Sequence, residues 1–343
     1  MESHITTAST RSYVFDYLRV FAMFGVLAVH ISQQFFVPFT FLKQVMGMGQ
    51  FCVQIFFVIS AYLACSYFFK RGCSTSGYYK RRLLRILPTY YAAIVAAMLY
   101  IEFTTEGYET DIFHLGWLRY FFALNTILPS ADYRAWNNAF AFWTLSDFLF
   151  FYALVPYLIK VFNTFRRCVY FFFICIIVAT ITRCICVDFN SSCFSELPTM
   201  IRQSPLCQMQ HFAAGMMTFF AVREEKKSIA VLILVLTAML PYVVCDSALT
   251  FAILTGIFIL SVKEEDIAVK SRWVLFFSKY SFHIYLTHVL ALAIGWRIAD
   301  LLFVRDISPF SYHLTRLFVF IGGTIALCCF LEIVQRIANR VFK

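Results

Sequence analysis

The sequence predicts an all-α protein that crosses a membrane about ten times. Of its 343 residues, 61% are hydrophobic and only 14% are charged, and the mean hydropathy is +0.74. Soluble domains have about 25% charged residues, so this chain cannot cover a water-soluble surface of its size, and disorder is excluded on the same ground. Its 12 glycines and 8 prolines are too few for the many turns of a β-barrel.

Apolar segments of sufficient length define the spans, because a helix needs about 20 mostly apolar residues to cross the hydrocarbon layer. The predicted spans are 13–37, 46–69, 86–103, 143–159, 168–187, 206–222, 229–244, 248–262, 273–296 and 310–333. Residues 112–128 are also apolar, but they contain His114, Arg119 and Asn125. This segment is either an eleventh span or a re-entrant or interfacial segment.

The basic residues predict how the chain is oriented. With the N-terminus inside and 112–128 not spanning, 19 of the 29 lysines and arginines fall in inside loops, as the positive-inside rule requires. If 112–128 spanned, the basic loops after it would change sides. We therefore expect ten spans with both termini in the cytoplasm, which explains the net charge of +10 without a nucleic-acid partner.

One membrane domain over residues 1–343 is expected, because no repeat, low-complexity tract or appended soluble domain interrupts the pattern. Most of the 12 cysteines lie in apolar runs without zinc spacing, and we interpret them as small apolar residues. Cys186 and Cys193 could pair only if their loop faces an oxidising compartment. The histidines lack the i, i+4 spacing of a helical zinc motif, so no metal is expected.

The first span carries three ionisable residues, Asp16, Arg19 and His30. Such residues are costly inside a membrane and indicate function by default. Arg19 and His30 are eleven positions apart, which places them on nearly the same helix face about 16 Å apart. Asp16 and Arg19, at i and i+3, can pair. The alternatives are that this pair only anchors the helix end and that His30 is a hydrogen-bonded core histidine.

Five segments carry a family resemblance. They are FDYLRVFAMFGVLAVH around Arg19 and His30, QIFFVISAYL at 54–63, YYKRRLLRILPTYY at 78–91, FWTLSDFLFFYALVPYL around Asp147, and SFHIYLTHVL at 281–290. In this order they resemble the signature of the membrane-bound acyltransferase 3 family, over about residues 12–335. Ala61 stands where that family usually has glycine.

The resemblance implies O-acylation, usually O-acetylation, of a surface or lipid-linked carbohydrate by a protein of a bacterial-type cytoplasmic membrane. The implied acyl donor is cytosolic acetyl-coenzyme A, a co-substrate. Some relatives carry a fused extracytoplasmic hydrolase-like domain. Because this chain ends soon after the last predicted span, we expect it to act on its acceptor directly or to pass the acyl group to a separate extracytoplasmic transferase.

One position departs from the family pattern. The family often has a glutamate five residues after the tryptophan, where this chain has Phe148. Asp147 stands one position earlier, a rotation of about 100° on a helix. Either the local backbone compensates for this offset, or Asp147 has another role.

Acyl transfer to a hydroxyl requires a base, oxyanion stabilisation and a site that excludes water. His30 is the best candidate base, and Asp147 or Asp16 could orient it. The candidate hydrogen-bond donors are Ser60, Tyr62, Ser146 and Tyr152. His288 is either a supporting residue or a hydrogen-bonded core histidine. His283, five residues before it, points to a different helix face and is expected to contribute less, and His211 is interpreted as mainly structural.

Arginines bind phosphates well. Arg19, Arg82 and Arg85 are therefore the candidate residues for binding the phosphates of coenzyme A. Arg82 and Arg85 share a helix face at i and i+3, although plain positive-inside charge is the competing explanation. The rival functions are a transporter or flippase for a lipid-linked sugar, and a non-catalytic relative that senses a lipid or ligand.

Overall fold

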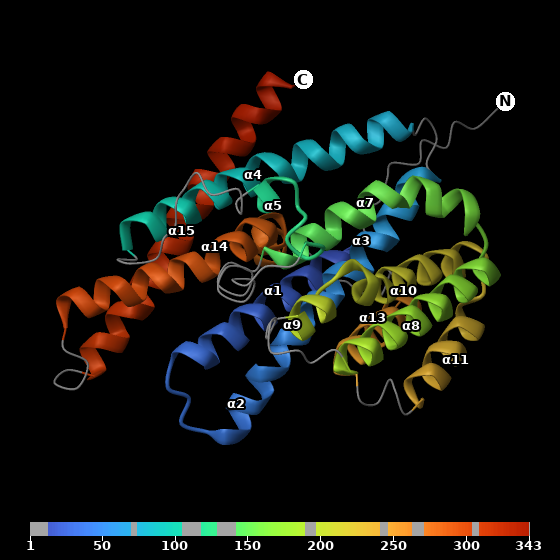
Figure 1. The fold of residues 1–343 in the computed structure, drawn as a ribbon, viewed down its shortest axis with the longest axis horizontal. Helices are drawn as coiled ribbons and strands as arrows, with labels where there is room; N and C mark the ends of the chain where they lie inside the picture. Colours follow the sequence, from blue (N-terminus) through green and yellow to red (C-terminus); the bar gives the residue numbers. More distant parts are fainter. Residues whose placement is uncertain are drawn as a thin grey trace.

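The computed structural model describes residues 13–69, 74–104, 118–128, 142–188, 197–240, 246–262, 271–303 and 309–342. Within these ranges the regular structure is helical throughout (Figure 1). The elements are α1 Tyr13–Gln34, α2 Thr40–Gly47, η1 Met48–Cys52, α3 Val53–Phe68, α4 Thr75–Thr104, α5 Leu118–Phe121, α7 Trp143–Val161, α8 Phe165–Asp188, α9 Leu197–Arg202, α10 Pro205–Arg223, α11 Lys227–Ala238, α13 Ser247–Ser261, α14 Arg272–Leu302 and α15 Pro309–Val341.

Seven helical segments of the described chain are long and apolar enough to cross a membrane. They are Tyr13–Gln34, Thr40–Phe68, Thr75–Ile101, Trp143–Val161, Phe165–Ile185, Arg272–Leu302 and Phe310–Val341. The remaining three predicted spans correspond to α10, which contains several polar residues, and to α11 and α13, which have only 12 and 15 residues. The prediction of an all-α, polytopic membrane protein is confirmed.

The ambiguous segment 112–128 is described only from residue 118 onward, and there it forms the four-residue helix α5 followed by turns. It packs against α4, because the hydroxyl of Tyr90 donates to the carbonyl oxygen of Tyr120 at 2.7 Å. Asn125 and Thr126 are fully buried. Its described part therefore contains no membrane-crossing helix. The side chain of Cys186 and all of Cys193 lie outside the described residues, so their pairing remains an expectation.

Contacts bring several basic helix ends to one end of the bundle. The hydroxyl of Ser278, near the start of α14, donates to Asp16 near the start of α1. Near the end of α15, Gln335 donates to the carbonyl oxygen of Leu84 in the first half of α4 at 2.7 Å. Each contact joins two helix ends that the predicted topology places on the same side of the membrane.

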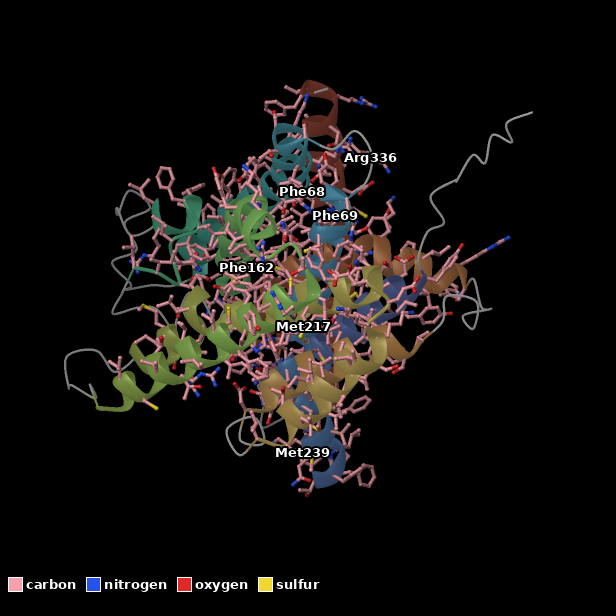
Figure 2. The ribbon with its side chains drawn as sticks, turned by 90° about the vertical axis from the view of Figure 1, so that its right-hand side faces the viewer. Phe68, Phe69, Phe162, Met217, Met239 and Arg336 are labelled. Atoms are coloured by element: carbon pink, nitrogen blue, oxygen red, sulfur yellow. The ribbon has the colours of Figure 1, made fainter. Side chains whose placement is uncertain are left out.

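Helix α10 is the most enclosed element of the described bundle, and it packs against α3, α8 and α13. Met217 on this helix lies in the middle of the molecule (Figure 2) and is fully buried. At Gly215 a Cβ atom would lie 2.3 Å from the carbonyl oxygen of Val58. Only glycine permits this close approach of α10 to α3, the helix that carries Ser60.

Gly215→Ala is therefore expected to destabilise the protein by about 2 kcal/mol, because the added methyl group forces two packed helices apart. The measurement is thermal unfolding of the purified protein in one detergent. Gly322→Ala is the matched control, since a Cβ atom at Gly322 meets nothing within 4 Å. Alanine in an open helical position costs nothing and gains up to about 1 kcal/mol. Equal unfolding temperatures for the two variants would contradict this account of the packing.

Candidate functional site

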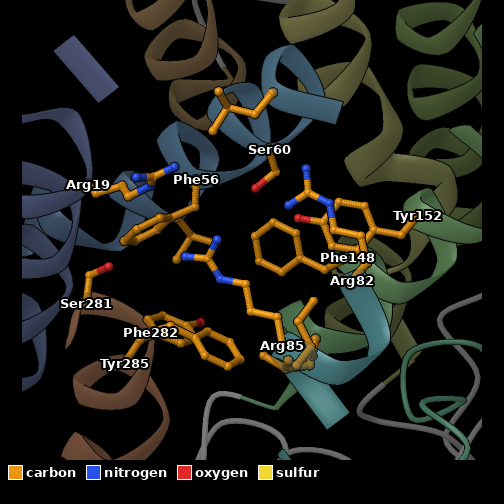
Figure 3. A pocket seen from close by; sticks show the side chains of 14 residues that line it. Arg19, Phe56, Ser60, Arg82, Arg85, Phe148, Tyr152, Ser281, Phe282 and Tyr285 are labelled. Carbon is orange, nitrogen blue, oxygen red and sulfur yellow. The ribbon is translucent and has the colours of Figure 1, made fainter. Parts of the chain in front are cut away.

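A cavity of about 110 Å³ lies between α1, α3, α4, α7 and α14 (Figure 3). Apolar side chains, among them Phe56 and Phe148, form much of its wall. Its polar lining consists of Arg19, Ser60, Arg82, Arg85, Tyr152, Ser281 and Tyr285. The cavity thus combines an apolar wall with convergent polar groups, the usual composition of a small-molecule site.

Arg82 and Arg85 reach the cavity from the same face of α4, as their i, i+3 spacing predicts. The guanidinium of Arg82 lies 4.8 Å from the ring centroid of Tyr152, so a cation–π contact fixes its direction. Within the described part of the chain, neither arginine contacts a carboxylate. Both cations are therefore available to an anionic ligand.

The predicted pair of Asp16 and Arg19 is present, with 3.4 Å between a carboxylate oxygen and a guanidinium nitrogen. Asp16 is only 2% exposed and also accepts the hydrogen bond from Ser278 of α14. The pair therefore does more than anchor the end of α1. It ties α1 to α14 and holds Arg19 at the cavity wall.

His30 and His288 face each other across α1 and α14, with ring centroids 5.0 Å apart. His288 is fully buried, and its Nδ1 lies 2.7 Å from the carbonyl oxygen of Tyr285. A carbonyl oxygen only accepts, so Nδ1 carries the proton and Nε2 keeps its lone pair. Within the described structure this Nε2 has no hydrogen-bond partner. His30 is partly exposed. His288, the buried histidine of the pair, is therefore the one whose tautomer is fixed by this hydrogen bond.

Tyr285 connects the histidine pair to the cavity. Its side chain lines the cavity, and its ring lies 5.7 Å from that of His288. Its hydroxyl is 2.9 Å from the hydroxyl of Thr144 on α7. Neither His30 nor His288 lines the cavity directly. His288 contacts a cavity residue through the ring of Tyr285, and His30 contacts His288.

Asp147 and Phe148 point in different directions from α7. Phe148 lines the cavity, and its ring lies 4.9 Å from that of Phe57. Asp147 is 1% exposed and lies near Thr126 and Tyr285 instead. Neither carboxylate oxygen of Asp147 has a hydrogen bond within the described residues. Because α7 is helical from Trp143 onward, the backbone does not compensate for the offset of one residue.

A family model described as an acyltransferase domain matches residues 12–333. The chain belongs to the acyltransferase 3 family. No curated protein and no solved structure matches it. The resemblance inferred from five sequence segments is thereby confirmed, and the protein is a membrane acyltransferase.

For this acyltransferase, the position of the usual family glutamate is occupied by an apolar side chain that faces the cavity. Asp147 does not replace that carboxylate at the cavity wall, and no hydrogen bond joins it to His30. Its predicted catalytic role thus remains a prediction without a supporting contact. The polar surroundings of Asp147 include Ser146, whose hydroxyl donates to the side-chain oxygen of Asn125.

The other candidate residues of the acyltransferase divide into two groups. Ser60 and Tyr152 line the cavity. Tyr62 does not; its ring packs 4.9 Å from that of Phe15 and 5.4 Å from that of Phe219. His211 is buried beside the ring of Phe57, away from the cavity.

Of the polar cavity residues, Ser281 and Tyr285 were not among the residues singled out from the sequence. With His288 they occupy positions i, i+4 and i+7 of α14, which share one helix face. That spacing is visible in the sequence and is the signal that would have found them. Among the described residues, no group of three histidine, cysteine, aspartate or glutamate side chains could hold a metal ion.

Proposed function

We propose that this acyltransferase moves an acyl group, most simply acetyl, from cytosolic acyl-coenzyme A to a hydroxyl of a surface or lipid-linked carbohydrate. The proposed location is a cytoplasmic membrane of bacterial type. The observation that supports this most directly is the cavity that is lined by Arg19, Arg82 and Arg85 and by Tyr285, whose ring contacts that of His288. The acceptor is the carbohydrate itself or a separate extracytoplasmic transferase.

Coenzyme A suits this set of residues. Guanidinium groups bind phosphates with two parallel hydrogen bonds, and charges without a partner are costly near a membrane interior. Arg82 and Arg85 lack a carboxylate partner in the described chain, so an anionic ligand would offset that cost. These two arginines, with Arg19, would hold the donor, which supplies a thioester to the site.

His30 is assigned the proton transfer. As the acceptor oxygen bonds to the acyl carbon, His30 takes the hydroxyl proton, and it returns that proton to sulfur when the carbon–sulfur bond breaks. His288 is oriented by its own Nδ1–H bond to the carbonyl oxygen of Tyr285. Its lone pair on Nε2 is free to accept a hydrogen bond from the His30 ring within the contact of the two residues.

Deleting the gene and examining surface glycans by NMR tests this function. We expect O-acyl groups to disappear from at least one glycan and to return when the wild-type gene is restored. Unchanged acylation of every surface glycan would contradict the proposal. Because Phe148 occupies the cavity wall in place of a carboxylate, the second candidate is a non-catalytic relative, for which coenzyme A binding would persist without any change in acylation.

A further inference from the structure

A second and wider recess adjoins the cavity. It has a volume of about 470 Å³ and is formed by residues from the first halves of α1, α4 and α14. Its charged lining residues are Asp16, Arg19, Arg85, Arg272 and Lys279. Arg19 and Arg85 line both spaces, so the cavity and the recess meet at these two side chains.

The charges of the recess do not balance. Its one carboxylate, Asp16, is paired with Arg19 and accepts a hydrogen bond from Ser278. Lys279 lies 3.6 Å from Glu332 of α15. Arg85 and Arg272 contact no carboxylate in the part of the chain that the structure describes. The recess therefore carries positive charge that the described part of the chain does not neutralise.

The start of α14 adds to this charge. The helix begins at Arg272, and the side chain of Ser271 does not cap it. The free backbone N–H groups of the first turn give a helix N-terminus a partial positive charge that favours anions. The lining side chains and the helix end thus favour the same kind of ligand.

We propose that this recess is a subsite for the phosphates at the nucleotide end of the donor, with Arg272 and Lys279 as its own binding residues. The proposal deepens the proposed function and rests on coenzyme A as the donor. Pockets for ligands of that size measure about 300–1,000 Å³. The recess, at about 470 Å³, falls in this range, whereas the inner cavity, at about 110 Å³, takes only a narrow chain.

Direct binding tests the subsite without requiring acyl transfer. The probe is adenosine 3′,5′-bisphosphate, titrated calorimetrically into the full-length protein in nanodiscs. The Arg272→Ala/Lys279→Ala variant is expected to raise the Kd about tenfold, the effect of losing about 1.4 kcal/mol. Arg340→Ala is the matched control, because Arg340 is an exposed cation near the end of α15 that lines neither space. An unchanged Kd in the double variant would overturn the proposal.

Two further arms identify the ligand. With acetyl-coenzyme A as donor, the double variant should raise KM about tenfold, while KM for acetyl-pantetheine, which lacks the nucleotide, should not change. An equal rise of KM for both donors would overturn the proposal, because the effect would then not depend on the nucleotide. The same titration is made in nanodiscs of phosphatidylglycerol and of phosphatidylcholine. If the bisphosphate binds in phosphatidylcholine but is displaced in phosphatidylglycerol, the recess belongs to an anionic lipid headgroup instead. If wild-type protein transfers no acyl group yet binds the bisphosphate through these residues, the subsite stands and the proposed function fails.

Discussion

Replacing His30 with alanine is expected to lower acyl transfer by about 10²–10⁴-fold, the usual contribution of a positioned acid–base group. His30 is the partly exposed member of the histidine pair, and its partner His288 is fully buried. The measurement is transfer of labelled acetyl groups by purified protein at saturating donor. Binding of coenzyme A should remain close to wild type, because His30 does not line the cavity that carries the arginines.

His283→Ala is the matched control for this experiment. It removes another buried histidine, on α14, that does not line the cavity. Its activity should stay near wild type. Thermal unfolding of both variants excludes a general loss of structure. If His30→Ala keeps wild-type activity, His30 is not the base, even though the chain belongs to an acyltransferase family.

The Arg82→Ala/Arg85→Ala variant is expected to weaken coenzyme A binding by at least about a hundredfold. A hydrogen bond to a charged group contributes about 1.5–3 kcal/mol, so two such losses exceed the roughly 2.8 kcal/mol that a hundredfold change represents. KM for the donor should rise accordingly. Lysine at both positions should recover part of the affinity, because lysine keeps the charge but lacks the planar fork of arginine.

Arg81→Ala distinguishes coenzyme A binding by Arg82 and Arg85 from a general effect of the positive charge of this predicted cytoplasmic loop. Arg81 precedes Arg82 directly, but its guanidinium lies 5.4 Å from the ring centroid of Tyr67 and does not line the cavity. Arg81→Ala should therefore leave the donor KM unchanged. A loss equal to that of the double variant would show that the basic loop acts through its total charge alone.

The fold was predictable from the sequence wherever one long apolar segment forms one helix. The hydropathy of 13–37 and 310–333 was sufficient to predict α1 and α15, because a membrane imposes the length of a spanning helix. The end of α11 was less predictable, whereas α13 matches its predicted span 248–262 within one residue at each end. The apolar segment predicted to run to residue 244 continues past the end of α11 at Ala238, and hydropathy does not determine where an apolar segment leaves the helical conformation.

The site was predictable where spacing within one helix determines the geometry. The Asp16–Arg19 pair and the shared face of Arg82 and Arg85 follow from the helical repeat alone. Asp147 and Tyr62 could not be placed in this way. Which face of α7 or α3 meets the cavity depends on the packing of neighbouring helices. Successive residues of a helix point in directions about 100° apart, so one residue lines the cavity while the next packs between helices.

Arg19 and Arg85, which border both the inner cavity and the outer recess, also bear on the permeability of the bilayer. A protein that opens a polar space within the membrane risks leaking ions through it. Fixed cations that line such a space repel protons and sodium ions while they attract anions. The two guanidinium groups therefore favour anions over cations in both spaces.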